Sequence, residues 1–284
     1  MNSKNKNIEK LESILISSKH FFCISHFNGE LDWIKKINKS NYVVYNKSNK
    51  KLDKEINSIK IKNVGYNIYS YLNFIIENYE NLPDTIVFCK DNIFSRHLKI
   101  KTFSNLLKRN IFTCLEENNI SRPFPISVDF SDNSFNEINS SWYRFKHPRK
   151  FFSNYDIFYN YVFKNTKKPL FIRFAPGANY IVPKNNILLR TKNFYKNLKK
   201  FIDHSQYSCE SHFVERSLFL IWNSNLESSD NMDKIVSKIN LKYLVNNCEN
   251  LKQKEFRILE KIFQKVIFKI GSIYFSFLSK VLYK

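Results

Sequence analysis

The sequence predicts an α/β protein with a largely parallel central sheet. Short apolar runs bounded by polar residues alternate along the chain with segments whose apolar side chains recur every three or four positions. Such alternation favours parallel strands joined by helices. The 284 residues are also 43% hydrophobic and 16% aromatic, which is enough apolar surface to bury a substantial core.

The first third of the chain carries the clearest pattern. A polar arm precedes three apolar runs that are typical of buried strands, and two segments with helical periodicity separate these runs. In chain order the arm, strand, helix, strand, helix and strand are predicted at residues 1–19, 21–25, 30–37, 42–45, 66–79 and 85–89.

The middle of the chain is less regular, with prolines and Ser/Asp/Asn clusters that are typical of a long connection. A strand, a Pro-Gly turn and a second strand are predicted over residues 170–182, and helices within 185–202 and over 210–222. We therefore expect one α/β domain over residues 20–225, followed by a helical region over 226–284.

The last 30 residues form a basic amphipathic segment. Over residues 255–284, aliphatic and aromatic residues repeat on one helical stripe, lysines flank the stripe, and no acidic residue follows Glu260. This pattern predicts a helix that lies on an anionic membrane surface, the alternative being a stripe that packs on the domain or on a partner helix. No run of 18 apolar residues and no signal peptide is predicted, so we expect a cytoplasmic protein, peripheral at the inner face of the membrane.

The composition excludes several kinds of site. The four glycines lie at least 36 residues apart, whereas a phosphate-cradling loop of the P-loop or dinucleotide type needs two or three glycines close together. The five cysteines form no Cys-x-x-Cys pair, so the usual zinc spacing is absent and a reducing compartment is expected.

The net charge of +21, from 46 Lys and Arg against 25 Asp and Glu, favours an anionic partner. A nucleic-acid-binding protein is expected to gather its basic residues on one face, with aromatic residues between them. Here the basic residues are spread along the chain. We therefore expect no nucleic-acid partner and keep nucleic-acid binding as the alternative function.

Polar residues follow each of the first three predicted strands. They are Ser25 to Asn28 after the first strand, Asn46 and Lys47 after the second, and Lys90 to Asn92 after the third. Because open parallel sheets bind ligands beyond the carboxyl ends of their strands, we expect these residues to meet at one site.

Five segments stand out together by their order and spacing. They are HFNGELDW (26–33), YVVYNK (42–47), NVG and YSYLNFIIENYENLPDTIVF (within 63–88), FAPGANYIVPKNNILLRTKNFY (174–195) and SHFVERSLFLIW (211–222). In this arrangement the chain resembles, over about residues 22–222, an uncharacterised family of glycosyltransferase-like proteins. The resemblance implies a Rossmann-like GT-A sandwich with C-terminal helices. It also implies transfer of a sugar from a nucleotide-sugar donor to a saccharide or lipid-linked acceptor, in surface polysaccharide synthesis.

The chain departs from the family pattern at two places. Tyr66 and Asn67 stand where the family has an Arg-Glu pair, and Lys90 and Asp91 stand where it has Gln-Gly. Both places lie where a donor is expected, so a transferase-like protein without catalysis is a further alternative.

The resemblance and the strand ends together point to a set of site residues. Asp91 and Glu215 are the expected catalytic carboxylates, and Glu210 and His212 are expected on the acceptor side. Structural roles are the alternatives: a turn or helix cap for Asp91, an ion pair with Arg216 for Glu215, and a buried structural role for His212. The donor-binding residues are expected to be His26, Asn28, Asn63, Lys90, Arg173 and Arg216.

The metal expected of many GT-A enzymes has few ligands in this sequence. An Asp-x-Asp motif, which would hold Mn²⁺ or Mg²⁺ through hard oxygen ligands, is absent. The expected cofactor is therefore either Mn²⁺ or Mg²⁺ held by Asp91 or no cofactor, in which case cations of the protein stabilise the donor diphosphate.

Overall fold

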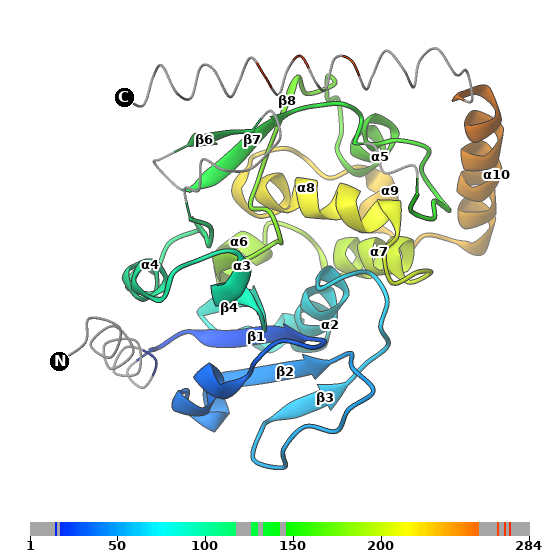
Figure 1. Cartoon of the computed structure of the whole chain (residues 1–284). Coiled ribbons are helices and arrows are strands. Elements are labelled where there is room, and N and C mark those ends of the chain that lie inside the picture. Colours follow the sequence, from blue (N-terminus) through cyan, green and yellow to red (C-terminus); the bar gives the residue numbers. More distant parts are fainter. Residues whose placement is uncertain are drawn as a thin grey trace.

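A mixed six-stranded sheet forms the centre of the molecule, with the strand order β3-β2-β1-β4-β9-β5 (Figure 1). The structure is a computed structural model and describes residues 15, 18–117, 126–129, 133–142, 146–255, 266, 270 and 273. The strands of this sheet are β1 (Phe21–His26), β2 (Tyr42–Asn46), β3 (Ser58–Lys60), β4 (Thr85–Lys90), β5 (Thr113–Cys114) and β9 (Tyr180–Pro183).

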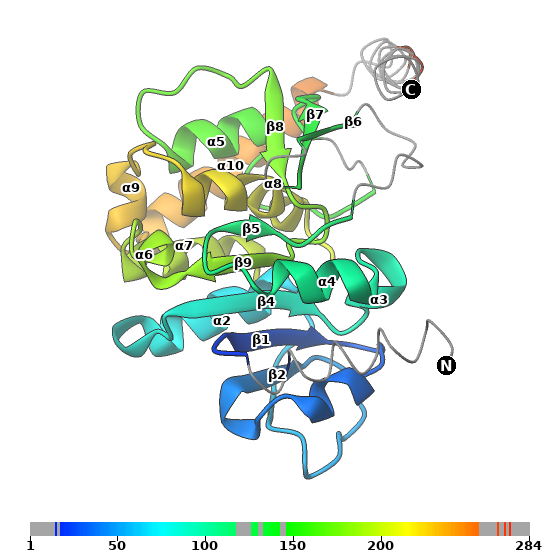
Figure 2. The same ribbon diagram turned by 90° about the vertical axis from the view of Figure 1, so that its left-hand side faces the viewer.

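Strands β3, β2, β1 and β4 are parallel, whereas β9 runs antiparallel to both β4 and β5. Figure 2 shows β2, β1, β4, β9 and β5 one above another. The predicted α/β class with a mostly parallel sheet is therefore confirmed.

Alternate residues of the inner strands face two different hydrophobic clusters, as the pleat of a strand requires. On β4, Ile86 and Phe88 belong to the larger cluster, and Val87 and Cys89 to the smaller one. The sheet is thus buried on both faces, which explains why its inner strands are continuous apolar runs.

Helices cover both faces. The larger cluster is completed by α2 (Ile68–Asn78), α5 (Tyr155–Val162), α7 (Lys192–Ile202) and α8 (Cys209–Asn223), and the smaller one by η1 (Asp32–Lys36), α3 (Ile93–Arg96) and α4 (Ile100–Leu106). The described ranges also contain η2 (Lys39–Asn41), η3 (Tyr79–Asn81), α6 (Lys184–Ile187), α9 (Asp230–Asp233) and α10 (Lys238–Glu255).

A second, antiparallel sheet lies beyond α8 (Figure 1). It has the strand order β6-β7-β8, formed by β6 (Ile126–Asp129), β7 (Ser134–Ile138) and β8 (Phe171–Phe174). The predicted pair of strands over residues 170–182 is confirmed, but its two members, β8 and β9, belong to different sheets.

The helix predicted over residues 30–37 is the short 3₁₀ helix η1 (Asp32–Lys36). Its backbone bonds run from Ile34 N to Leu31 O (3.1 Å) and from Ile37 N to Ile34 O (2.9 Å). The apolar residues Leu31, Ile34 and Ile37 are spaced by three, which fits the three residues per turn of a 3₁₀ helix.

The end of the chain is described only in part. Met232, Val236 and Leu244 belong to the larger hydrophobic cluster, so the start of the region 226–284 packs on the α/β domain. The predicted amphipathic helix over 255–284 lies outside the described residues except at Glu255, Val266, Ile270 and Ile273. Within the described ranges, no helix has both the length and the hydrophobicity needed to cross a bilayer.

Candidate functional site

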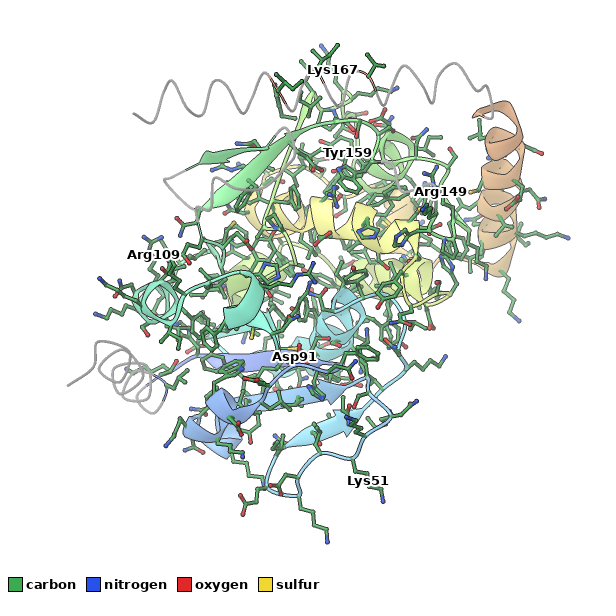
Figure 3. The ribbon with its side chains drawn as sticks, in the orientation of Figure 1. Lys51, Asp91, Arg109, Arg149, Tyr159 and Lys167 are labelled. Carbon is green, nitrogen blue, oxygen red and sulfur yellow. The ribbon has the colours of Figure 1, made fainter. Side chains whose placement is uncertain are left out.

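The candidate site lies at the carboxyl ends of β1 and β4. The chain proceeds from β1 outward to β3 on one side and returns to β4 on the other, so the strand order reverses between β1 and β4. Ligands of doubly wound sheets bind at such a switch point. Ser25 and Lys90 are paired there in the register, and Asp91 follows at the centre of the molecule (Figure 3).

Lys90 and Asp91 project to opposite faces of the sheet edge. Lys90 continues the row of Ile86 and Phe88, whereas Asp91 continues the row of Val87 and Cys89. The polar residues at this edge therefore form two groups, one around each of these side chains.

The Asp91 carboxylate organises the loop that follows β1. Its Oδ2 accepts hydrogen bonds from Phe27 N (2.9 Å) and Gly29 N (2.7 Å) and lies 2.9 Å from His26 Nδ1, while Oδ1 accepts one from Asn92 N (2.8 Å). Burial raises the pKa of Asp91, but these hydrogen bonds outweigh burial and lower it. Asp91 thus stays ionised and fixes the loop.

This environment leaves Asp91 little free capacity to bind a divalent metal. Oδ2 of Asp91 already has three hydrogen-bond or ion-pair partners, so most of its lone-pair capacity is used. The described ranges contain no group of three or more His, Cys, Asp or Glu residues arranged to hold a metal.

The side-chain ammonium of Lys90 has no oxygen atom as a hydrogen-bond or ion-pair partner among the described residues. Its Nζ lies 5.4 Å from the centroid of the Tyr66 ring, a cation–π contact. Burial lowers the pKa of Lys90, the negative charge of Glu215 raises it, and the positive charge of the exposed Arg96 lowers it. A half-buried ammonium in this setting is suited to an anionic ligand.

Glu215, on α8, faces the same group. Its Oε1 accepts a hydrogen bond from Gly177 N (2.7 Å), and its Oε2 lies 3.6 Å from His212 Nδ1 and 3.2 Å from Arg216 Nη1. Burial raises the pKa of Glu215, but His212 and the charges of Arg216 and Lys90 outweigh it and hold this pKa well below its usual range. Glu215 is therefore ionised at neutral pH and a weak proton acceptor.

Arg216 is held by other residues of the protein. Its Nε lies 2.5 Å from Glu137 Oε1 on β7, and the rings of Trp142 and Phe174 stack against its guanidinium. Because the guanidinium is already buried and paired with two carboxylates, binding a phosphate here would require these ion pairs to break. Arg216 therefore connects α8 to the second sheet.

The loop 175–179 completes the Lys90 group. Gly177 has φ +82°, and a Cβ atom added to it would lie 2.5 Å from His97 Cε1, so this close approach requires glycine. Asn179 Oδ1 accepts from Lys90 N (3.1 Å), while the buried Asn179 Nδ2 has no hydrogen-bond partner. An unsatisfied buried donor beside Lys90 is a second feature that suits an anion.

The remaining predicted residues divide between the two groups and the surroundings. His26 joins Asp91, and His212 joins Glu215. Glu210 is buried at the start of α8, where its carboxylate accepts a hydrogen bond from the backbone N–H of Lys150 in a neighbouring loop. Arg173 donates from Nε to Ser134 Oγ (2.7 Å) on β7, Asn28 is exposed in the loop after β1, and Asn63 is half-buried before α2.

Sequence reasoning missed several members of the Lys90 group. Two of the missed residues lie far along the chain from their partners: Asn179 is 89 residues from Lys90, and Glu137 is 79 residues from Arg216. The scarcity of glycine was a usable signal, since two of four glycines, Gly29 and Gly177, lie where a Cβ atom would collide with a side chain of the site. The missed residues are Tyr66, Arg96, His97, Glu137, Gly177 and Asn179.

The fold is an open, mostly parallel α/β sheet with polar residues at its switch point, the place where doubly wound sheets bind their ligands. Residues 24–236 match the family model described as "Protein of unknown function (DUF3431)", and the chain therefore belongs to this family. No curated protein and no solved structure matches the chain.

Proposed function

We propose that the protein transfers a sugar from a nucleotide-sugar donor to a saccharide or lipid-linked acceptor. The observation that carries the proposal is the Lys90 ammonium, which is half-buried at the switch point and has no oxygen partner among the described residues. The sequence resemblance to glycosyltransferase-like proteins supports the same reaction. A GT-A-type fold is part of the proposal, and the antiparallel β9 beside β4 is compatible with it.

In this proposal the donor diphosphate lies over Lys90. Bond breaking leaves negative charge on the diphosphate, and fixed cations and amide donors stabilise that charge. Lys90, Arg96 and the Nδ2 group of Asn179 provide such groups, and no step requires a metal.

The sugar is proposed to face Glu215. Positive charge develops on the sugar ring as the bond to the diphosphate breaks. Glu215 is suited to stabilise this charge, because its low pKa keeps it ionised. The acceptor hydroxyl oxygen then forms the new bond to the anomeric carbon as the bond to the diphosphate breaks, and the hydroxyl proton passes to an oxygen of the departing diphosphate.

The proposal is tested by a thermal-shift screen of nucleotide sugars with and without Mn²⁺, followed by an assay for released nucleoside diphosphate. We expect one donor to stabilise the wild type, and this effect to be lost in Lys90→Met. The matched control is Lys101→Met, which changes an exposed lysine on α4.

The outcomes separate the alternatives. Stabilisation without release of nucleoside diphosphate, with all acceptors tried, would favour a transferase-like protein without catalysis. No response to any nucleotide sugar, together with tight salt-sensitive binding of DNA or RNA, would overturn the proposal in favour of nucleic-acid binding.

A further inference from the structure

Tyr66 has a backbone conformation that bulky residues rarely adopt. Its φ is +56°, in the left-handed region, and it follows Gly65 at φ +62°. An aromatic residue there is strained, and such strain persists only where the surrounding structure imposes it.

Backbone bonds from the loop before α8 hold this turn. Gly65 N donates to Ser205 O (2.9 Å), and Tyr66 N donates to Gln206 O (3.0 Å). The turn therefore joins the start of α2 to the segment that leads into α8.

The buried Lys47, at the end of β2, holds the turn from the other side. Its Nζ donates to Val64 O (2.6 Å) and to Tyr66 O. The centroid of the Tyr69 ring lies 5.7 Å from Nζ. Lys47 thus binds the carbonyl groups on both sides of Gly65.

The strained backbone directs the Tyr66 ring to the middle of the Lys90 group. Its centroid lies 5.4 Å from Lys90 Nζ, 5.3 Å from the ring of His212 and 5.0 Å from the ring of Tyr207. A ring face attracts an ammonium without offering it an oxygen acceptor. The N–H groups of Lys90 are then left for oxygen atoms of a ligand.

We infer that Tyr66 is a positioning residue for Lys90, and that Lys47 holds it in its strained conformation. This inference rests on the proposed function, in which Lys90 binds an oxyanion. This arrangement favours a ligand with phosphate oxygens, because such oxygens can accept hydrogen bonds from all the N–H groups of Lys90 that the ring leaves unbonded.

The test uses Tyr66→Gly, because glycine adopts a positive φ without strain but has no ring. The first readout is the pH profile of Lys90 acylation, followed by mass spectrometry. The charged groups that face Lys90 are Glu215, Arg96, Glu116 and Asp91, and all of them are unchanged in this variant. We expect the titration midpoint of Lys90 to fall by about half a unit to one unit when the ring is lost.

The second readout is the affinity for inorganic pyrophosphate. We expect the dissociation constant of Tyr66→Gly to rise about three- to tenfold, while its melting temperature stays within a few degrees of that of the wild type because relief of strain offsets the lost ring contacts. Tyr66→Phe keeps the ring and is expected to behave like the wild type in both readouts. Lys47→Met is expected to reproduce the midpoint shift of Tyr66→Gly.

A Lys90 midpoint that is unchanged in Tyr66→Gly, or a Tyr66→Phe variant that behaves like Tyr66→Gly, would overturn the role of the ring. An unchanged midpoint in Lys47→Met would overturn the role of Lys47. If the wild type does not bind pyrophosphate, the anion site of the proposed function is wrong. The titration midpoint of Lys90 in Tyr66→Gly still tests whether Tyr66 positions Lys90.

Discussion

At the scale of single residues, Asp91 combines features of a catalytic carboxylate and of a structural one. It follows the central strand β4 at the switch point, where a ligand is expected. Its oxygen atoms nevertheless bind the backbone of the loop after β1 and the residue that follows it. The position of Asp91 could be predicted from the sequence, but its hydrogen bonds could not, because the loop lies more than 60 residues away.

Gly29→Ala is expected to destabilise the protein through this carboxylate. A Cβ atom at position 29 would lie 2.5 Å from Asp91 Cγ, so either the loop or Asp91 must move. We expect a loss of about 1–3 kcal/mol in the free energy of unfolding, measured by urea denaturation. Glu30→Ala, an exposed change in the same loop, is the control. Equal stability of the two variants would contradict the tight packing of Gly29 on Asp91.

Lys47 is expected to make stability depend on pH. Burial lowers its pKa from 10.5 to about 7. Between these values the unfolded chain keeps a proton that the folded chain has released, so stability rises with pH. We expect the wild type to gain up to about 1.4 kcal/mol per pH unit relative to Lys47→Met between pH 7 and 10. Parallel pH profiles of the two proteins in urea denaturation would show that Lys47 titrates normally.

At the scale of elements, the inner strands follow from hydrophobic pattern alone, because strands buried on both faces are continuous apolar runs. Whether the helix between β1 and β2 is an α-helix or a 3₁₀ helix depends on the exact spacing of its apolar residues. Leu31, Ile34 and Ile37 are spaced by three, which matches the observed 3₁₀ hydrogen bonds. The second sheet was not predicted in full, because its three strands come from both sides of α5. When strands from such distant segments pair, the sequence near each strand gives little indication of its partner.

The start of α8 depends on Glu210. Its Oε1 accepts hydrogen bonds from Lys150 N and Phe151 N (both 2.7 Å), and its Oε2 lies 3.0 Å from His204 Nε2. Glu210→Ala would leave these backbone donors without an acceptor in a buried place. We expect a loss of about 3 kcal/mol in the free energy of unfolding.

Urea denaturation of Glu210→Ala tests this expectation, with the exposed Glu227→Ala as the control. A variant that keeps wild-type stability but loses transferase activity would instead support the acceptor-side role that the sequence suggested for Glu210.

At the scale of the whole molecule, the exposed side of α10 offers a surface for a membrane. Ile239 and Tyr243 lie four residues apart on α10 and are 81% and 65% exposed, and Ile235, which precedes the helix, is 55% exposed. Lys238 and Lys242 are exposed beside them on α10, and Lys234 is exposed before the helix. Exposed apolar groups next to lysines are the pattern by which interfacial helices bind anionic lipid, so we propose that this stripe, with the predicted C-terminal segment, contacts the membrane.

A vesicle sedimentation assay tests this surface. The wild type is expected to sediment with vesicles that contain phosphatidylglycerol and, much less, with pure phosphatidylcholine vesicles, since each lysine near an anionic surface contributes about 1 kcal/mol. The double change Ile239→Glu and Tyr243→Glu is expected to weaken binding at least about tenfold, because each adds a repelled charge and removes buried apolar area. Unchanged sedimentation would show that α10 takes no part in membrane binding.

The central claim is that the switch point of the sheet holds a nucleoside diphosphate through Lys90. Isothermal titration of the wild type and of Lys90→Met with the diphosphate of the nucleotide that the donor screen identifies tests this claim most directly. We expect Lys90→Met to weaken binding at least about tenfold, because charge-assisted hydrogen bonds are worth about 1.5–3 kcal/mol, while Lys101→Met binds as the wild type does. Equal affinities of wild type and Lys90→Met would contradict the claim.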